Sequence, residues 1–103
     1  MTKIIDLAAE FSTTPFGRFR GDGEFSAEHF RDDLLIPALR TNPVVVVDLS
    51  GSNLYGSSFL EEAFGGLLRH GFTQDQLSGK LQVKHKLLPS IEEEIKFYID
   101  RAD

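Results

Sequence analysis

The fold is decided by the stretch Val44-Val45-Val46-Val47-Asp48-Leu49-Ser50-Gly51-Ser52-Asn53-Leu54-Tyr55-Gly56-Ser57-Ser58-Phe59-Leu60. Its consecutive valines are β-branched and favour an extended backbone. A run that is apolar on both faces is typical of a central strand in a mostly covered sheet. Polar and small residues follow, and apolar residues at helical spacing come after Ser57 and Ser58. The stretch therefore predicts a buried strand, a tight loop and a helix that begins on two serines.

A helix that begins at these serines directs unpaired backbone N–H groups and the positive end of its dipole toward the residue at its start. Such an end is a favourable place for a phosphate group. Ser58 and Glu61 have capping-box spacing, which gives Ser58 a structural role as the N-cap. Ser57 has either the same structural role, if the helix starts one residue earlier, or a functional one.

The segments on either side predict further strands and helices. Ile4-Ile5-Asp6-Leu7 is short and β-branched and predicts an edge strand, and the alternation in Lys80–Lys84 predicts a strand beside the central one. A helix is expected after Ser26, with a kink or an end near Leu35 to Pro37, because proline lacks a backbone N–H. Strands that alternate with helices predict an α/β fold, a single domain over residues 1–103 with helices packed against a mixed sheet.

Composition restricts the class of protein. A chain of 103 residues with 41% hydrophobic content supports one compact core. The absence of cysteine excludes disulfides, thiolate metal sites and cysteine nucleophiles. A formal charge of −5, with scattered Lys and Arg residues, disfavours nucleic-acid binding. There is no apolar run of about 18 residues and no signal-peptide pattern, so we expect a cytoplasmic protein without membrane contact. The spacing of the histidines and carboxylates predicts neither a metal site nor a cofactor.

The segment from the central strand to the following helix resembles the STAS domain, the fold of anti-sigma factor antagonists and of the cytoplasmic tails of sulfate transporters. In that family a hydrophobic strand ends in a loop that carries Asp-Ser-Ser-Gly-Leu, whose first serine is the phosphorylated switch. The motif falls on Gly56-Ser57-Ser58-Phe59-Leu60, with Gly56 in place of the aspartate and Phe59 in place of the glycine. The chain is most similar to uncharacterised bacterial STAS-like proteins that share its Gly-Ser-Ser-Phe-Leu-Glu-Glu-Ala-Phe and Gly-Arg-Phe-Arg segments.

This resemblance implies a regulatory, non-catalytic module that binds a protein partner. The partner would be a serine kinase of the histidine-kinase-like ATPase type or an anti-sigma factor, and phosphorylation of Ser57 would switch the contact. Arg18 or Arg20 would neutralise the phosphate if the glycine-rich segment near them folds over the loop. The partner-binding loop is expected to comprise Asp48, Ser50, Asn53, Tyr55, Gly56, Ser57 and Ser58.

Two other functions are compatible with the residue types. A hydrolase triad of Ser57, His70 and Asp48 is disfavoured, because about thirteen residues of helix at 1.5 Å each separate the serine from the histidine. A small-ligand or nucleotide sensor would use the Gly17–Gly23 loop, although that loop matches neither common phosphate-binding glycine motif. The same segment, Phe16–Phe25, predicts a β-hairpin with Gly-Asp-Gly at its turn.

Overall fold

A parallel sheet forms one layer of the molecule in the computed structural model, which describes residues 1–53 and 57–102. Within those residues the strand order is β1-β2-β3, and both strand pairs are parallel. The strands are β1 (Thr2–Asp6), β2 (Val44–Asp48) and β3 (Leu81–Lys84). The predicted central strand, the edge strand before it and the neighbour after it are confirmed. The α/β class is confirmed as well, but the sheet is parallel rather than mixed, because helical crossovers connect its strands.

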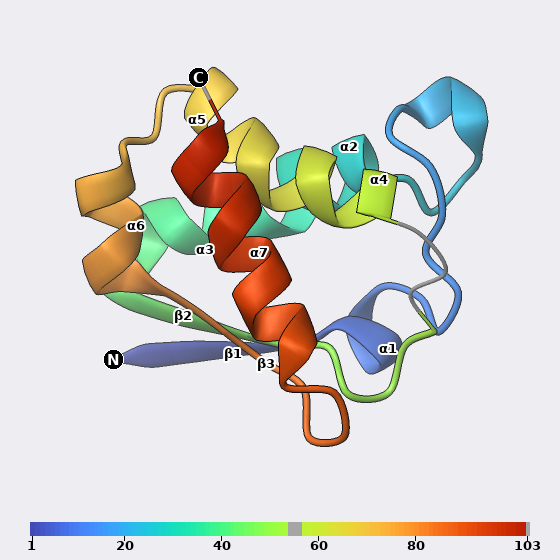
Figure 1. Cartoon of the computed structure of the whole chain (residues 1–103), viewed down its shortest axis with the longest axis horizontal. Coiled ribbons are helices and arrows are strands. Elements are labelled where there is room, and N and C mark those ends of the chain that lie inside the picture. Colours follow the sequence, from blue (N-terminus) through green and yellow to red (C-terminus); the bar gives the residue numbers. More distant parts are fainter. Residues whose placement is uncertain (54–56, 103) are drawn as a thin grey trace.

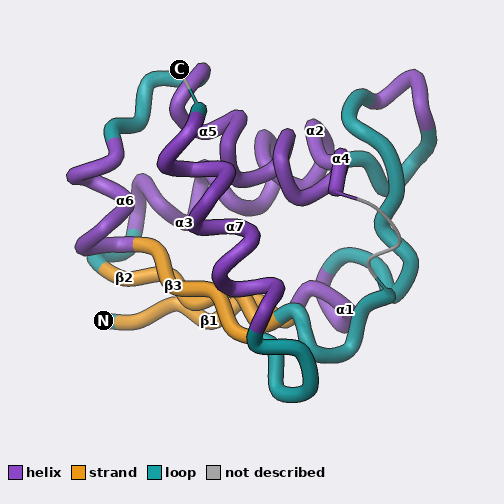
Figure 2. Tube along the Cα trace, in the orientation of Figure 1, coloured by secondary structure: helices purple, strands orange, loops and turns teal. Residues whose placement is uncertain are grey.

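Helices form the second layer and cover one face of the sheet (Figures 1 and 2). In the described part of the chain, no helix is long and apolar enough to cross a lipid bilayer. The α-helices are α1 (Leu7–Glu10), α2 (Ala27–Phe30), α3 (Ile36–Thr41), α4 (Ser57–Leu60), α5 (Gly66–Arg69), α6 (Gln74–Lys80) and α7 (Ser90–Arg101). A 3₁₀ turn, η1 (Arg20–Asp22), and two π-helical turns, η2 (Arg31–Leu35) and η3 (Glu61–Gly65), complete the helical elements.

The one-sided cover of the sheet corrects the expectation that the valine run is enclosed on both faces. Val45 and Val47 point toward the helices and are fully buried, whereas Val44 and Val46 are only half-buried. Ile4, the partner of Val46 on β1, is 56% exposed. β2 is central because it has a neighbouring strand on each side. One of its faces is nevertheless not covered by helices, so a central position in the sheet does not imply that both faces are covered.

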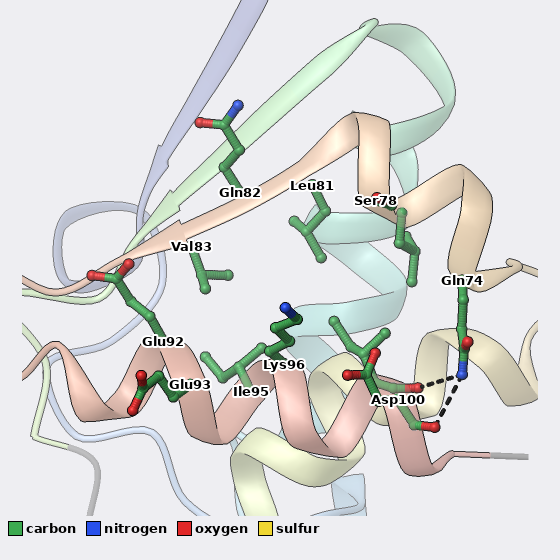
Figure 3. A pocket seen from close by; sticks show the side chains of 12 residues that line it. Gln74, Ser78, Leu81, Gln82, Val83, Glu92, Glu93, Ile95, Lys96 and Asp100 are labelled. Carbon is green, nitrogen blue, oxygen red and sulfur yellow. Dashed lines mark hydrogen bonds between the residues drawn. The ribbon is translucent and has the colours of Figure 1, made fainter.

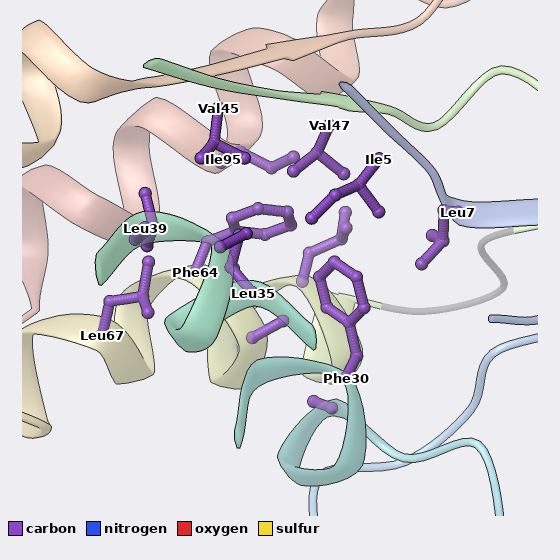
Figure 4. Packing of buried hydrophobic residues seen from close by; sticks show 14 of the residues in the cluster. Ile5, Leu7, Phe30, Leu35, Leu39, Val45, Val47, Phe64, Leu67 and Ile95 are labelled. Atoms are coloured by element: carbon purple, nitrogen blue, oxygen red, sulfur yellow. The ribbon is translucent and has the colours of Figure 1, made fainter. Parts of the chain in front are cut away.

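The core fills the space between the two layers (Figure 4). Phe30 and Phe64 stand at its centre, with ring centroids 6.3 Å apart, and each comes from one of the two interrupted helices. Ile95 of α7 closes the core on one side. The remaining fully buried aliphatic side chains in this cluster include Leu7, Leu35, Leu39, Val45, Val47, Leu49 and Leu67.

Each of the two long helices is interrupted by a π-helical turn. In the first, Ser26 caps α2 as predicted, since its Oγ accepts a hydrogen bond from the His29 N–H at 3.2 Å. The helix does not end near Pro37. Ile36 N–H donates to Arg31 O, five residues back, so the wide turn of η2 lies directly before Pro37, and the helix continues through the proline to Thr41. The second helix has the same kind of turn at η3, between α4 and α5.

Candidate functional site

The loop after β2 is held in place by hydrogen bonds to neighbouring segments. Asp48 Oδ1 accepts from Ser50 N–H at 3.0 Å, and Ser50 Oγ accepts from Lys86 N–H at 2.9 Å. Asn53 N–H donates to Thr13 O at 2.7 Å. The hydrogen bonds from Ser50, together with the charges of Lys84 and Lys86, lower the pKa of Asp48 against the effect of burial. Asp48 and Ser50 therefore have structural partners, while the Asn53 side chain is exposed.

Two of the predicted loop residues, Tyr55 and Gly56, lie outside the described residues. Ser57 is the first residue of α4, and Ser58 is the second. Ser58 is therefore inside the first turn rather than at the N-cap that its spacing from Glu61 predicted. Ser57 is exposed and Ser58 is half-buried. Of the two serines, Ser57 is the more exposed residue.

Ser57 lies near the C-terminal helix α7. Tyr98 donates its hydroxyl hydrogen to Glu94 Oε2 at 2.6 Å, and the Ser57 side chain is near enough to the same phenol to act on its pKa. Burial raises the pKa of Tyr98 and so does the hydrogen bond to Glu94, whereas the Ser57 side chain acts in the opposite direction. A hydroxyl at the start of one helix is thus linked to a tyrosine and a carboxylate on another.

The two predicted phosphate-binding arginines have carboxylate partners. Arg18 Nη1 donates to Glu61 Oε1 and, at 3.4 Å, to Glu62 Oε1, one turn beyond Ser57 on the same helix. Arg20 forms a bidentate ion pair with Asp33, and its shorter N–O distance is 2.9 Å. The glycine-rich segment does fold against the helix that begins at Ser57, but Arg18 reaches it at Glu61, and Arg20 pairs with the other long helix.

The Gly17–Gly23 loop is closed on itself. Asp22 Oδ2 accepts from the backbone N–H groups of Arg18, at 3.2 Å, and of Phe19, at 3.0 Å. Gly17 has φ of +87°, and a Cβ there would lie 2.7 Å from Asp22 Cβ. Phe16 N–H donates to Phe25 O, and Gly17 O and Arg18 O accept from the N–H groups of Ala27 and Glu28 in α2, so the chain returns through the 3₁₀ turn η1 to the start of a helix and not to a second strand. This corrects the predicted hairpin. Asp22 therefore occupies the amides of Arg18 and Phe19, and Glu28 occupies that of Arg20, so these three N–H groups are not free to hold a phosphate.

Sequence reasoning missed a buried cluster of charges where the two π-helical turns meet. Arg31 is 2% exposed and Glu62 is 6% exposed. Arg31 Nη1 donates to Glu62 Oε2 at 2.7 Å and to Glu62 O at 3.2 Å. Arg69 Nη2 approaches the other carboxylate oxygen of Glu62 at 3.3 Å. The available signal was the position of Arg31, four residues after Ala27 and before Leu35, on the apolar stripe of its helix.

The second glutamate of this cluster, Glu61, is partly exposed. Burial would raise the pKa of Glu61, but the hydrogen bonds and charges of Arg69 and Arg18 outweigh that effect and lower it. Glu61 therefore stays ionised and joins three segments of the chain: the glycine-rich segment, the π-helical turn η3 and α5.

The three residues weighed as a hydrolase triad lie on different parts of the fold. His70 follows α5, and its Nδ1 hydrogen-bonds Gly66 O at 2.8 Å, which caps the C-terminal end of the helix. Ser57 begins the same helix at its other end, and Asp48 is bound to Ser50. Each has its own local partners, and the helix separates the serine from the histidine.

A parallel sheet covered by helices on one face, with an exposed serine at the start of the helix after the central strand, defines a STAS-like α/β domain. The chain belongs to the family described as "STAS-like domain of unknown function (DUF4325)", whose model matches residues 26–96. This confirms the resemblance drawn from the sequence. No curated protein and no solved structure matched the chain.

Proposed function

We propose that this STAS-like domain is a non-catalytic regulatory module that binds a protein partner and is switched by phosphorylation of Ser57. The observation that supports the proposal most directly is the position of Ser57, exposed at the first residue of α4 and close to the Tyr98 phenol of α7. A kinase needs an accessible hydroxyl, and a switch needs that hydroxyl to contact something that the phosphate will disturb. Ser57 meets both requirements.

The electrostatics of the site explain how a phosphate would act. A phosphoserine carries about −1.5 to −2 charge, and the N-terminus of a helix favours a negative group by about 0.3–1 kcal/mol. Glu94 already accepts the Tyr98 hydroxyl hydrogen, so the phosphate and the Glu94 carboxylate would compete for one donor. Glu61 acts on the same phenol through its charge. Repulsion from these carboxylates would separate the start of α4 from α7 and change the surface that a partner meets.

The partner-binding surface centres on the described loop residues whose side chains are exposed. Asn53 and Ser57 have exposed side chains, whereas Asp48 and Ser50 hold the loop to its neighbours. The family resemblance points to an ATPase-type serine kinase or an anti-sigma factor as the partner. Arg18 would reach a phosphate on Ser57 only by giving up its bonds to Glu61 and Glu62.

A phosphorylation assay tests this function. The protein is incubated with ATP and the histidine-kinase-like ATPase encoded nearest to its gene, and the product is mapped by mass spectrometry. We expect one phosphate on Ser57, none on the Ser57→Ala variant and normal labelling of the matched Ser58→Ala variant. A Ser57→Glu variant should bind the same partner at least tenfold more weakly. Labelling at another residue, or equal labelling of both alanine variants, would contradict the proposal.

A further inference from the structure

The edge of the sheet at β3 borders a groove on the surface of the molecule. This groove has a volume of about 590 Å³ and lies between α6, β3 and α7 (Figure 3). Volumes of about 300–1,000 Å³ are usual for binding sites. The side chains of Leu81, Val83 and Ile95 point into it from the strand and the helix that form its walls. Gln74 closes one end, since its Nε2 donates to the backbone carbonyls of α7 near Asp100.

The backbone of β3 offers unpaired hydrogen-bonding groups to this groove. Lys84 O accepts from Leu49 N–H at 2.9 Å, so the Lys84 amide groups face β2. Successive residues of a strand face opposite sides, and the amide groups of Val83 therefore face the groove. The outward N–H groups on either side of Val83 already have acceptors: Leu81 N–H donates to Leu77 O, and His85 N–H donates to Glu92 Oε2. In the described residues, the Val83 N–H and C=O have no hydrogen-bond partner.

The charges around the groove are mostly acidic. Glu92, Glu93 and Asp100 of α7 line it together with one cation, Lys96. An extended peptide that carried lysine or arginine at alternate positions would direct these side chains toward α7, where their charged ends would meet the carboxylates and their aliphatic stems would contact Val83. Its apolar residues would lie on the other face of the added strand, beside the open face of the sheet. Both features follow from the period of two along a strand.

We propose that this groove binds an extended, basic segment of a partner protein, which pairs with the free edge of β3 as an additional strand. Recognition of this kind takes its affinity from main-chain hydrogen bonds and its specificity from alternate side chains. A second copy of this chain fits less well. Pairing of two β3 edges would bring the α7 helices of both copies together, so that Glu93 and Asp100 of each copy would face like charges.

This surface differs from the one proposed for the phosphorylation switch. The groove uses Glu92, Lys96 and Ile99 of α7, whereas the Ser57 contact uses Glu94 and Tyr98. These two sets lie on nearly opposite sides of the helix, because residues two apart are rotated by about 200°. Evidence against peptide binding in the groove would therefore not count against the phosphorylation switch at Ser57, and the reverse also holds.

A defined peptide probes the groove without knowledge of the natural partner. The probe is a heptapeptide of alternating lysine and valine, blocked at both ends, added to the full chain labelled with ¹⁵N. The matched control peptide has the same composition with its valines consecutive, so that the charge is kept and the alternation is lost. We expect the alternating peptide to shift the amide resonances of β3 and α7, and the control peptide to bind at least tenfold more weakly.

Three variants separate strand pairing from general attraction to an acidic protein. Glu93→Lys should weaken peptide binding at least tenfold, whereas Glu24→Lys, at an exposed site outside the groove, should leave it within twofold. Val83→Pro removes the outward N–H and leaves the bonds of β3 to β2 in place, so binding should be lost while the circular dichroism spectrum is retained.

Three results would overturn the proposal: equal binding of both peptides, equal effects of the two lysine variants, or resonance shifts confined to residues outside the groove. Self-association of the free chain through β3, detected by sedimentation equilibrium and by concentration-dependent shifts there, would assign the groove to a second copy instead.

Discussion

Replacing Glu62 with glutamine tests the buried ion pair that joins the two π-helical turns. The substitution keeps the shape of the side chain and removes its charge. The side chains of Arg31 and Glu62 are only 3% and 8% exposed, and Nη1 lies 2.7 Å from Oε2. Two unit charges about 4 Å apart interact by about 4 kcal/mol at an effective dielectric constant of about 20. Loss of one partner of a buried pair costs about 3–5 kcal/mol, because the other charge stays buried.

We therefore expect Glu62→Gln to lower the free energy of unfolding by about 3 kcal/mol, the lower end of that range, because the amide oxygen still accepts from Arg31. In a domain of this size the melting temperature falls by about 4–8 °C for each kcal/mol, so the expected drop is at least about 12 °C. Thermal and urea unfolding followed by circular dichroism at 222 nm measure both quantities. Asp33→Asn is the control, since Arg20 and Asp33 are 49% and 48% exposed and such pairs contribute about 1 kcal/mol or less.

A double-mutant cycle completes the test. Arg31→Met combined with Glu62→Leu replaces the pair with apolar groups, and we expect the double variant to lose much less stability than the sum of the two single changes. Additive losses, or a Glu62→Gln loss as small as that of Asp33→Asn, would show that the pair contributes no more than a surface contact. The account of the buried charges would then be refuted.

The other predictions concern single groups. The arginines lower the pKa of Glu61 in the folded protein. The ionised Glu61 should therefore stabilise the fold above about pH 4.3, the glutamate pKa of the unfolded chain, and this stabilisation should disappear as the pH falls through the lower folded pKa. Melting temperatures of the wild type and Glu61→Gln that stayed equally far apart down to pH 2 would contradict this. Spectrophotometric titration of Tyr98, with the other tyrosine replaced by phenylalanine, should give a pKa above about 10 that rises further in Ser57→Ala. A Tyr98 pKa that is the same with and without the serine would show that Ser57 does not act on this phenol. Gly66→Ala should destabilise the fold by about 1–3 kcal/mol, because its Cβ would lie 2.8 Å from the guanidinium of the tethered Arg31. Gly79→Ala, with no atom within 4 Å of the new Cβ, should stabilise α6 by about 0.5–1 kcal/mol. Urea unfolding measures both variants, and equal effects of the two alanine substitutions on the free energy of unfolding would argue against the close approach at Gly66.

Local patterns were sufficient for the order of the elements. The valine run predicted β2, Ser26 predicted the start of α2, and the motif around Ser57 and Ser58 predicted the family that the family model confirms. These features depend on residues close together in the chain, such as β-branching or a hydroxyl that caps the helix following it. The sequence alone also placed Ser57 at the start of a helix.

Contacts between distant segments were decided only by the tertiary structure. The partner of Arg31 is Glu62, and that of Arg18 is Glu61, because the fold packs the glycine-rich segment and the first long helix against the second. The exposed face of the sheet and the free edge of β3 depend on where the helices pack, which no local pattern records. A buried arginine is indistinguishable from a solvated one until the carboxylate that offsets its desolvation has been brought to it by the fold. The sequence therefore determined which segments form strands and helices, and the packing of these segments determined which charges are buried and which surfaces stay open.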